Sequence, residues 1–310
     1  MRTARWRAGA PLSPLTSPTL QKEPGQSQTV NGTVNVQPPL GPWRSGLRSQ
    51  VALLGIGLAW LLIVLSLGAP LLAPYDPVAV DLDAGMQRPS WQHWLGTDQL
   101  GRDVWSRLLW AGRTSVSVAT VIAVLTLAVG MSLGLLAGYS GGLLDDLTMR
   151  LTDFVAALPP IIVTLACIGT LGPSLPVLVL TLALTSWTPY ARLARSLVLQ
   201  MRIQEWVLAV YALGASPRRI LLRHVLPAVL GPVAVQVSLN IGGIILTVAG
   251  LSFLGLGIQP PTPEWGAMLV DARPFLASAP HLVLPPGLAI FLVVFGFTAL
   301  AERLTDRPQA

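Results

Sequence analysis

The sequence has few charged residues. Only 11% of its 310 residues are Asp, Glu, Lys or Arg, whereas 52% are hydrophobic. Soluble domains carry about 25% charged residues, so this composition excludes an ordinary soluble domain and predicts an integral membrane protein. The net charge of +6 would also suit a nucleic-acid-binding protein. Arginine-rich cytoplasmic loops of a membrane protein explain the same excess better, so we expect no nucleic-acid partner.

Several reactive groups are scarce or missing. The single cysteine, Cys167, excludes an internal disulfide, and its apolar neighbours favour a packing role. The sequence has no GxxxxGK[ST] phosphate-binding loop and no cluster with metal-ligand spacing. For His93 and His281, an interfacial or hydrogen-bonding role is favoured over a ligand role. We therefore expect no metal site and no enzyme activity, and any ATP hydrolysis must occur on another chain.

Five runs without Asp, Glu, Lys or Arg predict the membrane spans. They cover residues 50–75, 114–144, 154–191, 224–263 and 274–301. A spanning helix needs about 20 apolar residues, so the third run is long enough for two. Glycine and proline at residues 169–176 favour a break between those two, and the glycines and prolines of residues 250–263 predict an exit into a loop.

The predicted fold is therefore an all-α integral membrane protein with six transmembrane helices. The predicted spans are residues 50–73, 115–138, 154–171, 176–198, 228–250 and 282–301. With six spans, both termini, the loop around Arg150 and residues 192–223 share one side of the membrane, which also carries most of the arginines. The positive-inside rule places that side in the cytoplasm. Residues 1–49 are rich in Pro, Ser and Gln and predict a disordered cytoplasmic tail before the membrane domain of residues 50–305.

Two smaller patterns lie in and after the second predicted span. Glycines recur there every four residues, at Gly130, Gly134 and Gly138. Such a smooth helix face predicts close packing within this chain, in preference to a dimer seam. Farther along, Asp145, Asp146 and Asp153 flank Arg150. Ordinary solvated charge near a helix start is favoured here over a metal site.

The polar segment between the fourth and fifth spans, residues 205–227, contains the clearest local signals. Its first nine residues are mostly helix formers, and Gly214 then suits the left-handed conformation that ends a helix. Ser216 and Pro217 favour the start of a second helix, which Pro227 interrupts. We expect two short helices joined by a tight turn. An amphipathic loop on the membrane surface is the alternative, but this segmentation favours docking of a partner.

The segment resembles the EAA motif of permease subunits of ATP-binding cassette importers. The matching positions are Glu205, Ala209, Ala212, Leu213, Gly214, Ala215, Ser216, Arg223, His224, Leu226 and Pro227. Two positions depart from the commonest form: Val210 stands where a second alanine is usual, and Tyr211 where arginine is frequent. Both residues are tolerable on a packed helix.

Further blocks are similar to the dipeptide, oligopeptide and nickel branch of that family, and to its second, "C"-type permease. Residues 93–108 read HWLGTDQLGRDVWSRL, residues 138–142 read GYSGG and residues 251–257 read LSFLGLG. Leu158-Pro159 and residues 260–266 also fit. Several ordered blocks at consistent spacing make the resemblance specific, and it covers about residues 45–305.

The resemblance implies the type I importer architecture and alternating access. The implied partners are a homologous second permease subunit, two ATP-binding cassette ATPase subunits, an extracytoplasmic solute-binding protein and membrane lipid. It implies no cofactor on this chain, because ATP and Mg are bound by the ATPase subunits. The residues implied to couple to the ATPase are Glu205, Ala209, Ala212, Leu213 and Gly214. The loop of residues 96–103 is expected to be structural or to face the binding protein.

The expected function is import of dipeptides or oligopeptides across the cytoplasmic, or inner, membrane. A nickel or glutathione importer of the same family is the alternative, and the sequence identifies no substrate-binding residue. A self-contained channel or secondary carrier is a different class, but such carriers place ionisable groups at membrane depth, and the apolar runs contain none. An intramembrane enzyme would need paired catalytic groups at one depth, and none stands out.

Overall fold

The computed structural model describes residues 42–305. Helices dominate this part of the chain, and its only β pairing is an isolated antiparallel bridge between Thr97 and Asp103. The predicted all-α class is confirmed for these residues. The disorder predicted for the N-terminal tail falls largely on residues 1–41, outside the described residues. The first helix begins at Pro42, within the predicted tail.

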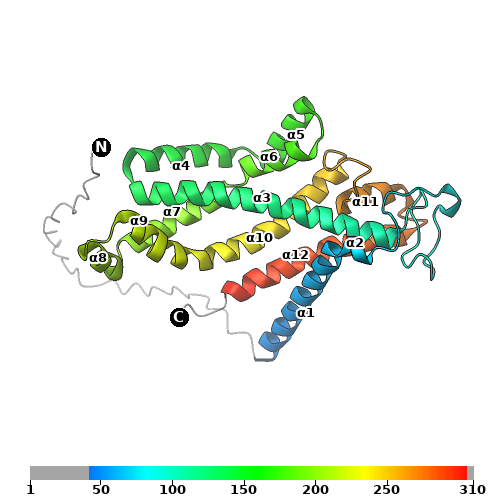
Figure 1. The fold of residues 1–310 in the computed structure, drawn as a ribbon, viewed down its shortest axis with the longest axis horizontal. Coiled ribbons are helices and arrows are strands. Elements are labelled where there is room, and N and C mark those ends of the chain that lie inside the picture. Colours follow the sequence, from blue (N-terminus) through cyan, green and yellow to red (C-terminus); the bar gives the residue numbers. More distant parts are fainter. Residues whose placement is uncertain (1–41, 306–310) are drawn as a thin grey trace, which may run out of the picture. The chain divides into compact units, whose positions relative to one another are not determined.

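Seven of the helices form the body of the membrane domain (Figure 1). They are α1 (Pro42–Leu67), α3 (Val104–Ser140), α4 (Gly142–Ala157), α5 (Pro160–Leu171), α6 (Leu175–Thr185), α7 (Thr188–Arg202) and α10 (Leu226–Phe253). The last long helix, α12 (Leu284–Thr305), packs against α1 and α10. Shorter elements are α2 (Ala69–Leu72), α8 (Glu205–Ala212), α9 (Pro217–Ile220) and α11 (Trp265–Ala272).

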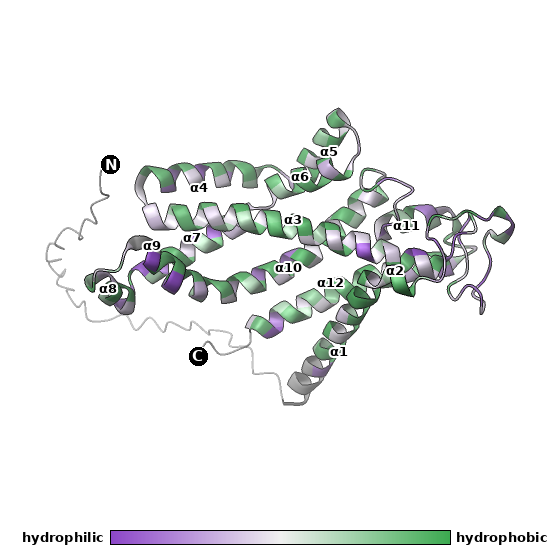
Figure 2. Ribbon diagram, viewed as in Figure 1, coloured by the Kyte–Doolittle hydropathy of each residue, from purple (hydrophilic) through white to green (hydrophobic). Residues whose placement is uncertain are grey.

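Five helical segments are long and apolar enough to cross a membrane. They are Gln50–Leu67, Val104–Ser140, Leu175–Arg202, Leu221–Phe253 and Pro280–Thr305. The pair α4 and α5 passes the same test together but is bent by 77°. Counted as one span, this pair makes six, as predicted. The long helices are largely hydrophobic, whereas hydrophilic residues gather at α9 and in the loops near α11 (Figure 2).

Proline explains where the helices break. The predicted break at residues 169–176 lies between α5 and α6. The predicted span 154–171 is not one straight helix, because it bends at Leu158-Pro159, and Pro160 then occupies the first turn of α5. The span predicted at 176–198 also has a break, at Ser186-Trp187. Proline lacks an amide hydrogen and clashes with the preceding turn, so it disrupts a helix interior but is tolerated in a first turn.

The glycine face of α3 packs against α7 within the same chain. A Cβ atom at Gly134 would lie 2.8 Å from the Ala194 Cβ, and one at Gly138 would lie 2.9 Å from the Val198 Cβ. Gly130 approaches the backbone of Trp187 and Ala191 just as closely. These distances leave no room for a larger side chain. The prediction that the glycines pack inside the chain is therefore confirmed.

Ion pairs join α4 to α7. The Asp145 carboxylate accepts two hydrogen bonds from Arg195, at 2.5 Å from Nε and 2.7 Å from Nη2. Asp145 is buried, so the prediction of ordinary solvated charge is wrong for this residue. Its apolar helical surroundings give the carboxylate little access to water, and a bidentate guanidinium partner compensates for this. Asp153 pairs with Arg192 at 2.9 Å, and both of these side chains are exposed, as predicted for Asp153.

The two ends of the long helices α3 and α10 differ in structure (Figure 1). At one end, which we call the α8 end, lie α8 and α9. At the other, the α11 end, α11 lies beside the loop that precedes α3. Glu264 begins α11 by accepting a hydrogen bond from the Ala267 amide at 2.9 Å, and it also accepts one from the Ser115 hydroxyl of α3 at 3.0 Å. Glu264 is almost fully buried, so these contacts anchor α11 on α3.

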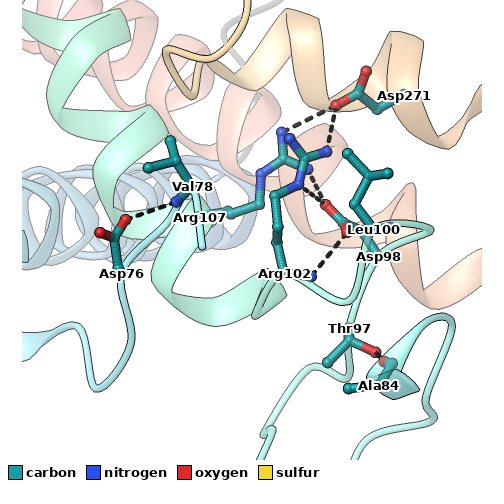
Figure 3. Close-up of polar contacts among 9 residues, drawn as sticks. All are labelled: Asp76, Val78, Ala84, Thr97, Asp98, Leu100, Arg102, Arg107 and Asp271. Atoms are coloured by element: carbon teal, nitrogen blue, oxygen red, sulfur yellow. Dashed lines mark hydrogen bonds and ion pairs between the residues drawn. The ribbon is translucent and has the colours of Figure 1, made fainter. Parts of the chain in front are cut away.

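An ion-pair cluster of the buried Asp98, Arg102 and Arg107 with the half-buried Asp271 completes the α11 end (Figure 3). Arg102 Nε lies 2.7 Å from Asp98 Oδ2, and Arg107 contacts the same carboxylate. Both guanidinium groups also reach Asp271 Oδ2 in α11, at 3.1 Å and 3.0 Å. The cluster therefore joins the loop of residues 96–103 to α3 and α11. The sequence predicted that this loop is either structural or faces a binding protein. These contacts support the structural role.

Candidate coupling site

Helix α8 follows α7 after a short extended link. Gln204 has an extended backbone, with φ −71° and ψ 137°, and its carbonyl accepts hydrogen bonds from the amides of Val207 at 3.0 Å and Leu208 at 3.1 Å. Glu205 occupies the first turn, where the positive end of the helix dipole favours an acidic side chain. The helix predicted over residues 205–213 is confirmed, since α8 runs over Glu205–Ala212 and Leu213 follows as its C-cap.

A glycine turn ends α8. Gly214 has φ +83°, a left-handed conformation that glycine adopts without steric penalty. Its amide donates to the Tyr211 carbonyl at 2.9 Å, and the Ala215 amide donates to the Val210 carbonyl at 3.3 Å. This pair of hydrogen bonds is the Schellman motif, which satisfies the last free carbonyls of a helix. The prediction that Gly214 ends the helix in this conformation is confirmed.

The second predicted helix differs from the structure. The Ser216 carbonyl accepts from the amides of Arg219 at 2.9 Å and Ile220 at 3.1 Å, so a helix does begin there, as α9. The prediction that Pro227 interrupts this helix is wrong. A π-helical turn, Leu221–Val225, carries the chain directly into α10, and the Leu226 amide donates to the Leu221 carbonyl five residues earlier. This wider turn just before Pro227 fits the loss of its amide hydrogen.

One face of α8 packs on the rest of the chain. Val207 is its only buried residue, at 3% exposure. It belongs to an apolar cluster with Val198 of α7 and with Ile220, Val225 and Val229 around the π-helical turn. The half-buried Val210 packs against the same cluster, which accounts for a branched side chain in place of the alanine usual in the EAA motif. This cluster joins α8 to α7 and α10.

The other face of α8 is exposed and largely apolar. Leu213 is 87% exposed, and Trp206, Leu208 and Tyr211 are each at least 40% exposed. All five residues predicted to couple to an ATPase lie on the exposed surface of α8 and its turn: Glu205, Ala209, Ala212, Leu213 and Gly214. An exposed apolar surface of this kind marks a contact with another protein or with the membrane.

A cleft of about 380 Å³ lies beside this face. It is lined by Val210, Leu213, Gly214, Ala215, Arg219, Arg223 and His224. The His224 ring lies 6.2 Å from the Trp206 ring, so the cleft adjoins the exposed side of α8. Two arginines give it positive charge. Arg223 and His224 match the EAA motif, but no local sequence signal predicts this cleft, which depends on the turn at Gly214.

These features define a class of protein: a multi-pass helical membrane subunit whose exposed, ordered insert is suited to docking another protein. Residues 130–308 match a family described as "Binding-protein-dependent transport system inner membrane component". The chain belongs to this family.

Three curated relatives agree with the family. The dipeptide transport system permease protein DppC of Alkalihalophilus pseudofirmus is 37% identical over 297 residues, which cover 94% of this chain and 95% of the relative. The nickel transport system permease protein NikC of Escherichia coli K12 is 41% identical, with coverages of 79% and 89%. The glutathione transport system permease protein GsiD of Pectobacterium atrosepticum is 40% identical, with coverages of 85% and 88%.

The chain is thus an importer permease of the ATP-binding cassette dipeptide, nickel and glutathione family. It is a multi-pass membrane protein, and the family implies the inner membrane as its location. Membership of this family also implies partner ATPase and permease subunits.

Proposed function

We propose that this permease imports dipeptides or oligopeptides across the cytoplasmic membrane, driven by separate ATPase subunits that dock on α8. The main support for docking is the exposed apolar face of α8. Leu213, which follows the last turn of α8, is 87% exposed, whereas Val207 on the opposite face is buried. Docking of a separate ATPase would cover this surface, and the sequence has no phosphate-binding loop of its own.

The proposed contact residues are Glu205, Ala209, Ala212, Leu213 and Gly214. Closure of two ATPase subunits around ATP would displace α8. Because Val207 packs on Val198 and Val225, a displacement of α8 would move α7 and the start of α10. The tight contact between α7 and the α3 glycines would extend that motion into the membrane domain. Alternating access then follows from the movement of packed helices as units.

The proposed assembly contains a homologous second permease subunit, two ATPase subunits and an extracytoplasmic solute-binding protein, in contact with membrane lipid. ATP and Mg would bind the ATPase subunits only, and the present chain would carry no cofactor. No nucleic-acid partner is proposed.

The proposed orientation places α8 and both termini in the cytoplasm. Support comes from the arginines of the insert and its flanks, such as Arg202, Arg219 and Arg223, because positive charge is retained on the cytoplasmic side. A cysteine introduced at Ser216, in a Cys167→Ser background, should react with a membrane-impermeant thiol reagent only from the cytoplasmic side. Reaction from the outside would overturn this orientation.

Coupling is tested at Gly214. Proline holds φ near −65°, far from the +83° of this residue, so Gly214→Pro should disrupt the turn that holds α8. We expect normal membrane insertion but loss of ATP-driven uptake in reconstituted proteoliposomes. Glu205→Lys should weaken coupling as well, because it reverses the charge at the start of α8. Normal uptake by well-inserted Gly214→Pro protein would contradict the coupling role.

The substrate is tested by comparing the uptake rates of three solutes. Support for peptides comes from the DppC relative, which matches over nearly the full length of both chains. The complete transporter should take up a radiolabelled dipeptide faster than glutathione or nickel ions. Preferential uptake of nickel or glutathione would replace this substrate assignment but leave the coupling proposal intact. Peptide transport by the chain alone, without ATPase subunits, would instead indicate a self-contained carrier.

A further inference from the structure

A second cavity lies among the membrane helices, midway along α3 and α10 and apart from α8. Its volume is about 310 Å³. Polar residues contribute much of its wall: Thr126, Thr185, Ser186, Thr188, Asn240 and Thr247. The remaining lining residues are apolar or glycine, and no lining residue is acidic or basic. A neutral polar cavity inside an apolar helix bundle requires an explanation.

Two helix breaks open onto this cavity. Ala156, Leu158 and Pro160 belong to the bend between α4 and α5, and Thr185, Ser186 and Pro189 to the break between α6 and α7. Pro160 and Pro189 have no amide hydrogen, so neither can donate to the carbonyl four residues earlier, in Ala156 and Thr185. Irregular backbone at membrane depth is tolerated where it is buried in protein or lines a polar cavity. Broken helices of this kind supply binding groups in transporters of other folds.

The side chains of the cavity offer both donors and acceptors. The hydroxyls of Thr185 and Thr247 donate to helix carbonyls, at 2.9 Å and 2.8 Å, which leaves their oxygens able to accept. Asn240 Oδ1 accepts from Gln236 at 3.4 Å, which leaves its amino group able to donate.

Tyr190 lies behind the wall of this cavity. It is fully buried, and its hydroxyl lies beside the side chains of Thr126 and Asn240. Both of those residues line the cavity, so Tyr190 helps to position its polar groups.

We propose that this cavity binds the peptide bonds of the transported solute through Asn240, Thr247 and backbone carbonyls of the two helix breaks. The proposal rests on the proposed peptide import. A peptide bond presents one neutral donor and one neutral acceptor, which matches the cavity wall. A metal ion would instead select carboxylate, imidazole or thiolate ligands, and none lines the cavity. The volume lies at the lower end of the range of small-molecule sites, which suits a dipeptide-sized segment.

The test uses the complete transporter in proteoliposomes, with radiolabelled alanyl-alanine as the probe. The variants Asn240→Leu and Thr247→Val remove polar groups from the cavity. Thr120→Val is the matched control, because Thr120 is an exposed α3 residue that does not line the cavity. We expect Asn240→Leu to lower the initial uptake rate by about tenfold, Thr247→Val by about threefold and Thr120→Val not at all. ATP hydrolysis stimulated by the binding protein should stay near the wild-type rate in all three.

Each outcome is decisive. Uptake by both cavity variants equal to that of Thr120→Val would overturn the site. Parallel loss of uptake and ATP hydrolysis would indicate a structural role and would also overturn it. Absence of wild-type alanyl-alanine uptake would overturn the peptide function itself, and this result is distinct from the other two.

A second measurement does not depend on the folding of the apolar variants. A Thr247→Cys variant in a Cys167→Ser background is treated with a methanethiosulfonate reagent during ATP turnover. We expect alanyl-alanine to slow the modification at least about threefold, because the solute would occupy the cavity. Equal modification rates with and without alanyl-alanine would contradict the proposal.

Discussion

The α11 end and the α8 end of this permease are built in opposite ways. At the α11 end, charged side chains are buried and paired, with Asp98, Arg102 and Arg107 each less than 10% exposed. At the α8 end, apolar side chains are exposed, and only Val207 of α8 is buried. A buried charge is costly unless it has a partner. An exposed apolar patch in water favours association with another molecule.

The difference shows which end forms its contacts within this chain and which end leaves an apolar surface for another molecule. The ion pairs of the cluster all form within one chain, so they stabilise the α11 end without another subunit. Much of the exposed face of α8 is left uncovered by the described residues, with Leu213 87% exposed, although the glycine turn and the apolar cluster hold α8 in place. Substitutions at the two ends should therefore affect different properties: stability at the α11 end and association at the α8 end.

The largest effect on stability is expected for Asp98→Asn. It leaves two buried guanidinium groups to share Asp271, and removal of one partner from a buried ion pair destabilises by about 3–5 kcal/mol. We expect low accumulation in the membrane and a clearly lower Tm in detergent. Asp76→Asn is the control, because the exposed Asp76 carboxylate only accepts from the Val78 amide at 2.9 Å (Figure 3). An unchanged Tm for Asp98→Asn would show that the cluster does not stabilise this end.

An intermediate effect on stability is expected for Gly134→Ala, in the contact between α3 and α7 that lies between the two ends. The new methyl group would lie 2.8 Å from the Ala194 Cβ and closer still to the Ala191 backbone, so α3 and α7 must separate. Overpacking of this kind costs about 1–3 kcal/mol. Gly169→Ala in α5 is the control, because a Cβ at Gly169 meets no atom within 4 Å. Thermal unfolding in detergent gives the Tm of both variants, and equal Tm values would indicate that α3 and α7 are loosely packed.

The smallest effect on stability is expected for Leu213→Glu. This side chain is 87% exposed, and surface substitutions away from packed features change stability by about 0.5 kcal/mol or less. Leu82→Glu is a matched control near the α11 end, because Leu82 is 73% exposed. Both variants should keep the wild-type Tm in detergent. A large drop for Leu213→Glu would mean that Leu213 contributes to the fold of this chain.

Local sequence signals predicted much of this structure. The charge-free runs predicted the long helices, residues 169–176 predicted the break between α5 and α6, and Gly214 predicted the end of α8. These features depend on the residues of one segment, so the segment itself contains the information. The glycine spacing on α3 also predicted close packing within the chain, because a smooth helix face requires a nearby partner.

Features that depend on distant contacts could not be predicted. Asp98 and Asp271 meet through two arginines although they lie far apart in the sequence, and no local pattern pairs them. The bend at Leu158-Pro159 does have a local signal, the prolines at 159 and 160, but the length of the charge-free run favoured a single straight span. Pro227 was expected to end the second short helix, but a π-helical turn just before it continues the chain into α10. The neutral cavity draws its wall from six helices, so no single segment reveals it.

The most direct test of the account is whether the ATPase subunits remain bound to the permease when the exposed face of α8 is altered. The complete transporter would be purified through a tag on the permease, and the amount of ATPase retained would be compared between Leu213→Glu and Leu82→Glu. We predict at least about tenfold less ATPase with Leu213→Glu, because a charge in the centre of an apolar interface typically costs 2 kcal/mol or more. Full retention with Leu82→Glu is predicted. Full retention of the ATPase by correctly inserted Leu213→Glu protein would contradict the docking role of α8.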